Sequence, residues 1–151
     1  MKKKRITKLA VVIVSAAMVV SLAACGSNTS SVNYKDGTYT GRSSERPADE
    51  DGNGSGYGEV EIEIKDNRIT ACTFKTYELD GTLKDENYGS DLTKENRMKA
   101  QKAVQAADKY AEMVVENGSA DDVDAISGAT INCEELKEAA ADALSKAEIK
   151  D

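Results

Sequence analysis

The sequence has 151 residues, of which 40% are hydrophobic, and its 20 basic and 27 acidic side chains give a formal net charge of −7 at pH 7. A chain of this charge is repelled by phosphate backbones, which argues against nucleic acid as a partner. Histidine is absent and the three cysteines have no CxxC or CxxH spacing. These absences exclude a Ser-His-Asp hydrolase and disfavour zinc, iron–sulfur and c-type haem sites, so no metal ligands are predicted.

The first 24 residues have the pattern of an export signal. Five basic residues lie before an apolar run that extends from Leu9 to Ala24. At its end, Leu22-Ala23-Ala24-Cys25 resembles the lipobox of bacterial lipoproteins, in which the cysteine is lipidated and becomes the first residue after cleavage. The rival interpretation is a transmembrane anchor, but the run is short for a membrane span and stops at a cysteine followed by glycine and polar residues. We therefore predict a lipoprotein signal peptide over 1–24 and lipidation of Cys25.

Cleavage before Cys25 would leave 127 residues with a net charge of −12, because it removes five basic residues and no acidic one. Residues 26–33 have the small and polar composition of a flexible tether. The remaining length supports one modest core and one domain. The predicted organisation is thus a signal peptide over 1–24, a lipidated cysteine and tether over 25–33, and one domain over 34–151.

Strand signals open this domain. Asp36-Gly37 precedes the β-leaning run Thr38 to Thr40, and a polar, glycine-rich loop is predicted from Ser43 to Gly58. A phosphate-binding P-loop is a weak interpretation of the glycines at 52–58, since no strand precedes them and no Lys-Ser/Thr pair closes them.

A hairpin is predicted to follow the loop. Apolar residues at 60, 62 and 64 alternate with charged ones, which is typical of a half-buried strand. Asp66-Asn67 then predicts a two-residue turn into a partner strand from Ile69 to Tyr77. The apolar phase shifts within this second strand, which indicates a bulge.

Two helices are predicted after the hairpin. Apolar residues at three- and four-residue spacing from Thr93 to Glu116 indicate a long amphipathic helix that Asn117-Gly118 would end. A last helix is predicted from Glu134 to Ala147, with Asn132 as its N-cap and Glu135 completing a capping box. The fold class that follows is α+β: a small, mostly antiparallel sheet packed against a long helix and a C-terminal helix.

The stretch Asp124-Ala125-Ile126-Ser127-Gly128-Ala129-Thr130 leads into this last helix. The three residues before Thr130 are small, so the backbone can approach a bulky group closely and the threonine hydroxyl is displayed. Free backbone N–H groups and the positive end of the helix dipole would lie beside it, which suits a phosphate. The plainer interpretation is a glycine-containing turn before a capped helix, and spacing alone favours it.

This stretch resembles the flavinylation motif of the FMN-binding domain family, which reads acidic residue, two mostly apolar residues, Ser or Thr, Gly, Ala, then the acceptor Thr or Ser. The likeness continues upstream in DGTYTG (36–41) and GYGEVEIEIKDNRITA (56–71). In that family a flavin transferase joins the phosphate of FMN to the acceptor hydroxyl as a phosphodiester. The resemblance therefore implies covalent FMN on Thr130, a recognition or loop-stabilising role for Asp124, and a framing role for Ser127, Gly128 and Ala129. Asn132 and Cys133 depart from the family pattern, which often has Ser or Thr there.

The resemblance implies an electron carrier rather than an enzyme. Its partners would be the flavin transferase and a membrane electron donor such as a quinone or NADH dehydrogenase. Rnf and sodium-pumping NADH:quinone reductase subunits carry related domains behind a transmembrane anchor, whereas the lipobox at Cys25 indicates a lipid-anchored protein at the outer face of the bacterial cytoplasmic membrane. Two alternatives stay open: a non-redox surface lipoprotein that binds a ligand or serves as an adhesin, and a flavoenzyme that reduces a small acceptor such as fumarate.

Two details stay open as well. The tyrosines in the middle of the domain are Tyr57, Tyr77, Tyr88 and Tyr110, and the sequence does not choose which of them stacks on a flavin ring. A disulfide between Cys72 and Cys133 is permitted outside the cytoplasm, but a buried thiol at Cys72 and an incidental small residue at Cys133 form the plainer interpretation.

Overall fold

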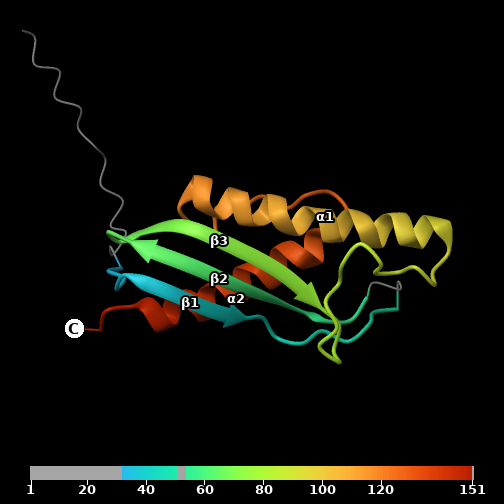
Figure 1. Cartoon of the computed structure of the whole chain (residues 1–151), viewed down its shortest axis with the longest axis horizontal. Coiled ribbons are helices and arrows are strands. Elements are labelled where there is room, and N and C mark those ends of the chain that lie inside the picture. Colours follow the sequence, from blue (N-terminus) through green and yellow to red (C-terminus); the bar gives the residue numbers. More distant parts are fainter. Residues whose placement is uncertain (1–31, 51–53, 151) are drawn as a thin grey trace, which may run out of the picture. The chain divides into compact units, whose positions relative to one another are not determined.

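The computed structural model describes residues 32–50 and 54–150, so the predicted signal peptide, Cys25 and most of the predicted tether lie outside the described residues. The described chain contains the strands β1 (Gly37–Arg42), β2 (Tyr57–Lys65) and β3 (Arg68–Tyr77) and the helices α1 (Lys94–Asn117) and α2 (Thr130–Ala147). The strands form one antiparallel sheet in the order β1-β2-β3, which the two helices cover (Figure 1). The predicted α+β fold is confirmed. No helix in the described part of the chain combines the length and apolar character needed to cross a membrane.

The β2–β3 hairpin forms as its turn residues predict. Asp66 and Asn67 have φ angles of 51° and 60°, as a two-residue type I′ turn requires. The predicted bulge is also confirmed, because the register shifts after Glu63 and leaves Thr70 of β3 as the extra residue. On both sides of the bulge, apolar residues of β3 therefore stand opposite apolar residues of β2, namely Ile69, Cys72 and Phe74.

The core lies between one face of the sheet and the two helices. Val60, Ile62 and Ile64 of β2 point into it and are at most 2% exposed. An alanine-rich face of α2 packs closely on β1. At Gly41 of β1, an added Cβ would lie 2.5 Å from the backbone nitrogen of Ala143, so only glycine permits this approach.

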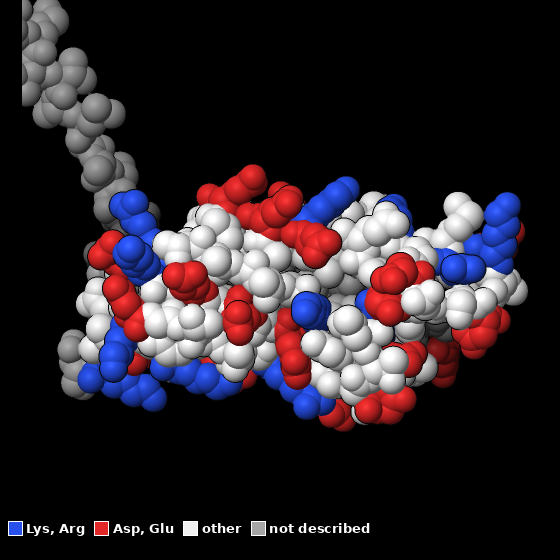
Figure 2. All heavy atoms as spheres, viewed as in Figure 1, with Lys and Arg blue, Asp and Glu red and all other residues white. Residues whose placement is uncertain are grey.

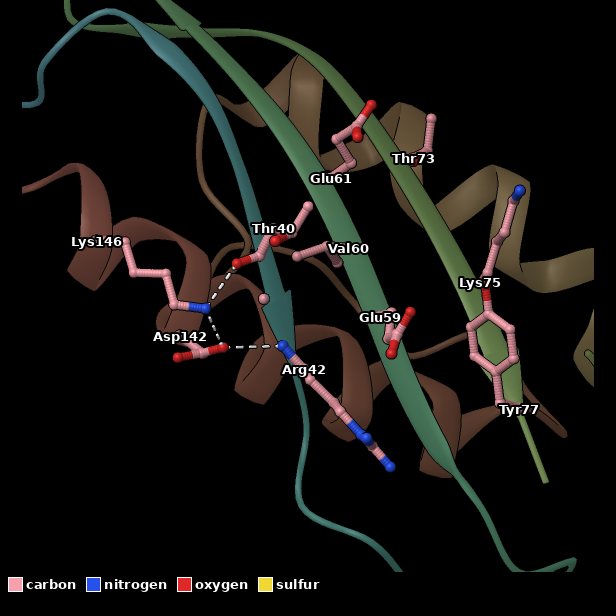
Figure 3. Close-up of a pocket in the computed structure, with 11 residues that line it drawn as sticks. Thr40, Arg42, Glu59, Val60, Glu61, Thr73, Lys75, Tyr77, Asp142 and Lys146 are labelled. Atoms are coloured by element: carbon pink, nitrogen blue, oxygen red, sulfur yellow. Dashed lines mark hydrogen bonds and ion pairs between the residues drawn. The ribbon is translucent and has the colours of Figure 1, made fainter. Parts of the chain in front are cut away.

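Side chains of α2 occupy the free edge of β1. The Lys146 ammonium donates to the carbonyl oxygen of Thr40 (2.8 Å), and Asp142 accepts from the backbone N–H of Arg42 (3.0 Å), as Figure 3 shows. These side chains satisfy backbone N–H and C=O groups at the edge of β1 that could otherwise pair with another strand.

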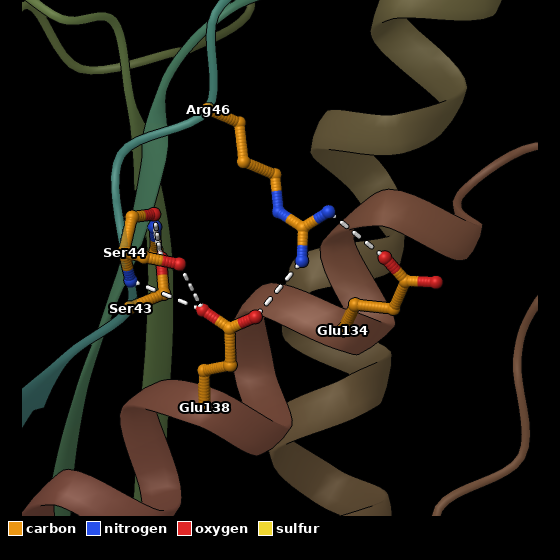
Figure 4. A network of polar contacts seen from close by, with 6 residues as sticks. Ser43, Ser44, Arg46, Glu134 and Glu138 are labelled. Atoms are coloured by element: carbon orange, nitrogen blue, oxygen red, sulfur yellow. Dashed lines mark hydrogen bonds and ion pairs between the residues drawn. The ribbon is translucent and has the colours of Figure 1, made fainter.

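One turn earlier on α2, Glu138 continues this row of contacts (Figure 4). Its Oε2 accepts from the backbone N–H and the hydroxyl of Ser44 (3.1 and 2.5 Å), while its Oε1 accepts from Arg46 (2.9 Å). Arg46 also contacts Glu134 at 3.0 Å. The loop after β1 is thereby tied to the first half of α2.

These contacts predict a loss of stability in acid. The Ser44 hydroxyl lowers the pKa of Glu138, and the Lys146 ammonium lowers the pKa of Asp142. A carboxyl group whose folded pKa is depressed contributes stability that is present above its unfolded pKa and is lost as the pH falls through the folded pKa. We therefore expect the free energy of unfolding to drop as the pH falls through about 4, and Glu138→Gln to weaken this dependence.

Urea unfolding of wild type and Glu138→Gln at pH 7, 5 and 3.5 measures this effect. The difference between the two proteins is the informative quantity, because burial raises the pKa of Glu135 and so gives a pH dependence of opposite sign. The same pH dependence in both proteins would show that the Glu138 contacts add no stability at neutral pH.

Candidate functional site

The stretch Asp124–Thr130 forms the loop between α1 and α2, and one buried hydroxyl anchors it. Tyr110 of α1 is 0% exposed. Its hydroxyl accepts from the backbone N–H of Ile126 (2.8 Å) and donates to the carbonyl oxygen of Ala129 (2.9 Å). The N–H of Ala129 in turn donates to the carbonyl oxygen of Ile126 (2.9 Å). Tyr110 thus fixes both ends of a tight turn and is not available to stack on a ligand.

This turn presents Thr130 at the surface. Gly128 has a φ of +83°, which favours glycine, and an added Cβ would lie 3.3 Å from Nζ of Lys102. Asp124 and Ser127 are exposed, Ala129 is buried, and Thr130 is the exposed first residue of α2. No side chain caps the first turn of α2. The Thr130 hydroxyl therefore stands beside an uncapped helix N-terminus.

The predicted capping box is wrong. Asn132 and Glu135 lie inside α2, which begins two residues before Asn132. The Asn132 amide is buried and donates to the carbonyl oxygen of Ala103 in α1 (2.9 Å). The hydrogen bond from Tyr110 ends the preceding turn at Ala129, so α2 starts earlier than the predicted cap at Asn132. Asn132 therefore connects α2 to α1 instead of capping α2.

The two cysteines in the described chain are free thiols. Cys72 on β3 is half-buried, and burial raises its pKa to about 11. Cys133 is buried, with Sγ 3.8 Å from the carbonyl oxygen of Val123. The burial of the pair differs from the plainer interpretation, because Cys72 is only half-buried and Cys133 is part of the core.

A cavity of about 200 Å³ opens near the start of α2. Its lining comes from the loop after β1, from the segment before β2 and from the residue after Thr130: Arg46, Pro47, Asp49, Gly54 and Ile131. Both terminal nitrogens of Arg46 are held by glutamates of α2, while its Nε is buried and has no partner in the described residues. An unpaired donor therefore lies at the wall of this cavity.

The segment Gly54–Gly58, predicted as loop, changes into strand β2 at Tyr57, and its alternate residues are glycines. An added Cβ on the first would collide with the Tyr88 hydroxyl. On the second it would lie 2.6 Å from Nζ of Lys84, and on the third 3.0 Å from Cβ of Glu135. Because alternate residues of an extended chain face the same side, these glycines bring Tyr88, Lys84 and Glu135 into one row.

Two residues of this row, Glu135 and Lys84, carry charges that few neighbouring groups balance. Glu135 is 1% exposed and its Oε2 has no partner in the described residues. Burial raises its pKa, and Lys84 and Arg46 act in the opposite direction. Burial lowers the pKa of the Lys84 ammonium, which lies 5.2 Å from the centre of the Tyr88 ring. No side chain of the described chain forms an ion pair with Lys84.

A larger cavity of about 500 Å³ opens on the sheet face opposite the helices. Figure 3 shows Glu59, Glu61 and Lys75 on this face, and the space-filling view shows acidic and basic side chains interspersed over the molecule from the side of Figure 1 (Figure 2). The rings of Tyr57 and Tyr77 stack on each other with centres 5.3 Å apart. Of the four candidate tyrosines, Tyr88 is the one whose hydroxyl lies against Gly54, which lines the smaller cavity.

The family model of the FMN-binding domain matches residues 53–145, which is more than half of the chain and includes β2, β3, both helices and the motif loop. The chain belongs to the FMN-binding domain family. The predicted membership of this family is thereby confirmed, and the cofactor of this domain is FMN. No curated protein matches the chain.

Among solved structures, the CPE2226 protein from Clostridium perfringens is similar, with a TM-score of 0.55 and 23% sequence identity over 76% of this chain and 88% of that chain. At this identity the likeness concerns the fold alone. It agrees with the α+β architecture described above.

The residues next to Thr130 fit FMN chemically. The phosphate of FMN is an anion, and the uncapped first turn of α2 and the cationic side chain of Lys102 suit it. The flavin ring carries both hydrogen-bond donors and acceptors. The buried atoms Nε of Arg46 and Oε2 of Glu135, which have no partner among the described residues, supply one of each.

Proposed function

We propose that this FMN-binding domain is an electron carrier outside the cytoplasm, with FMN joined through its phosphate to the Thr130 hydroxyl. The observation that carries this proposal is the match of Asp124–Thr130 to the acceptor motif, on a loop that leaves the hydroxyl exposed. A phosphodiester at this atom would lie against the first turn of α2, whose N–H groups have no side-chain cap. Helix N-termini of this kind stabilise phosphate groups.

The other motif residues serve the acceptor indirectly. Gly128 permits the left-handed backbone of the turn, and buried Ala129 accepts the hydrogen bond from Tyr110. Ser127 and Asp124 are exposed, so a flavin transferase can reach them while the fold stays intact. We assign Asp124 to recognition by that transferase, since its carboxylate projects from the loop without a role in the core.

The flavin supplies the electron-transfer chemistry, and this chain supplies attachment, orientation and electrostatics. The cavity between Arg46, Gly54 and Ile131 is the natural place for the ring, because Ile131 follows the acceptor directly. Tyr88 would border the ring on one side. A ring held so close to the surface can exchange electrons with partner proteins, for which we propose a membrane donor such as a quinone or NADH dehydrogenase.

Production of the full chain with and without a flavin transferase tests this function. With the transferase, we expect a yellow protein whose flavin absorbance survives denaturation and whose mass rises by one FMN less one water. Without it, the mass should stay that of the bare chain. A colourless protein of unchanged mass in both cases would favour the alternative of a non-redox surface lipoprotein.

The lipid anchor is tested separately. Cys25→Ser removes the thiol that a lipid would occupy, so we expect lipid labelling to disappear and the protein to leave the membrane fraction, with flavin loading unaffected. Metabolic labelling with a fatty acid and membrane fractionation measure both effects. Lipid labelling of the serine variant at the wild-type level would contradict the assignment of Cys25.

A further inference from the structure

The row of Tyr88, Lys84 and Glu135 takes no part in the attachment of FMN, and it points to a second task of the site. We propose that the Lys84 ammonium, held between Tyr88 and Glu135, raises the reduction potential of the flavin by stabilising the negative charge of the reduced ring. This inference rests on the proposed function. It assigns a specific side chain to the electrostatic control of the cofactor.

Lys84 does not have the surroundings of an ordinary surface lysine. A lysine usually keeps its ammonium in water and buries only its aliphatic stem. Here the side chain is half-buried, and the space left by the missing side chain of Gly56 receives its Nζ. The Tyr88 ring lies 5.2 Å from the ammonium, and Lys84 is in none of the ion pairs of the described chain. Glu135 and Glu78 act on its pKa without forming an ion pair with it.

Glu135 lies behind this cation. Its carboxylate is almost fully buried, and one of its oxygens has no hydrogen-bond partner in the described residues, which is unfavourable for a charged group. Lys84 and Arg46 both act to keep it ionised. Together Lys84, Glu135 and Arg46 form a charge cluster, in which Arg46 is already paired with Glu134 and Glu138 and Lys84 is the cation without an ion pair in the described chain. The Tyr88 ring beside Lys84 belongs to a side chain whose hydroxyl lies against Gly54, a residue that lines the cavity.

A cation without an ion-pair partner has a direct consequence for a flavin beside it. Uptake of two electrons from a reductant and of one proton from solvent gives the reduced ring a negative charge that the oxidised ring lacks. At low effective dielectric, an ammonium near the ring stabilises that charge more strongly than it would in water. Loss of the ammonium must then shift the equilibrium towards the oxidised ring.

Redox titration of the flavin-loaded full chain with dithionite, followed by absorbance, tests the proposal. For Lys84→Met we expect the preference for the reduced ring to fall at least tenfold, which for a two-electron couple lowers the midpoint potential by about 30 mV. Lys84→Arg should keep most of the wild-type potential, since it keeps the charge. Lys84→Gln is a second neutral variant in case Lys84→Met folds poorly.

Lys75→Met is the matched control, because it removes the same charge from the sheet face opposite the helices. The proposal is overturned if Lys84→Met shifts the potential no more than Lys75→Met does, or if Lys84→Arg shifts it as much as Lys84→Met. The mass of each protein is measured first. A wild type without the flavin adduct rejects the proposed function, whereas an intact adduct with an unmoved potential rejects only the role of Lys84.

Discussion

Thr130→Ala should abolish the covalent flavin adduct completely, because it removes the oxygen that attacks the phosphoryl group of the flavin donor. Thr130→Ser should retain part of the labelling, since the hydroxyl remains while the methyl group that restricts its rotamer is lost. Thr130 is exposed, so neither change should alter the free energy of unfolding by more than about 0.5 kcal/mol. Flavin fluorescence of the denatured protein and its intact mass measure the adduct.

Ser127→Ala is the matched control on the same loop. Ser127 is exposed but belongs to the frame of the motif, so we expect a clear fraction of labelling to survive. Asp124→Ala should reduce labelling by weakening recognition, with the fold retained. A flavin-bearing peptide from the Thr130→Ala protein, or an adduct mapped to Ser127, would refute the assignment of the acceptor.

Local patterns were sufficient to predict most of the fold. The period-two alternation of β2 predicts its buried face because one side of this sheet packs on helices and the other does not. Asp66 and Asn67 predict the hairpin because few residue types tolerate a positive φ. Gly118 ends α1 in the left-handed conformation, as Asn117-Gly118 predicts, while Thr93, predicted as the first helical residue, is its N-cap.

The misplaced start of α2 shows where such patterns fail. A capping box is recognised by residue types at fixed spacing, but the helix start is determined here by Tyr110, which is 19 residues away from Ala129 in the chain. The same residue types at Asn132 and Glu135 serve tertiary contacts instead. Local spacing carries no information about such distant partners.

The sequence predicts an acceptor residue, whereas it does not predict the residues around it. The motif is contiguous and ends at Thr130, so a resemblance was sufficient to propose this residue. The charge cluster comes from three separate segments, represented by Arg46, Lys84 and Glu135. The sequence contains one signal of these surroundings, the alternate glycines of Gly54–Gly58, which the P-loop pattern did not explain. Alternate glycines indicate that one side of the chain lies close to other groups.

Tyr110→Phe should destabilise the domain and slow its flavinylation together. The phenol oxygen is the partner of the Ile126 N–H and the Ala129 carbonyl group, and phenylalanine leaves both without it in an apolar environment. An unsatisfied buried polar group costs about 1–3 kcal/mol, so we expect a loss of about 2–3 kcal/mol in the free energy of unfolding after partial relaxation of the loop. Urea unfolding measures this loss.

Flavinylation of Tyr110→Phe should be slower even where the protein is fully folded, because the turn that presents Thr130 is no longer fixed at its two ends. The time course of adduct formation, measured well below the unfolding midpoint, separates this effect from global unfolding. Tyr39→Phe is the matched control: its hydroxyl donates to the carbonyl oxygen of Lys35 (2.9 Å) at the surface, far from the motif in the chain. Its stability should change by less than about 1 kcal/mol and its labelling rate should stay at the wild-type value. Equal labelling rates for Tyr110→Phe and Tyr39→Phe would show that the turn holds its conformation without the buried hydroxyl.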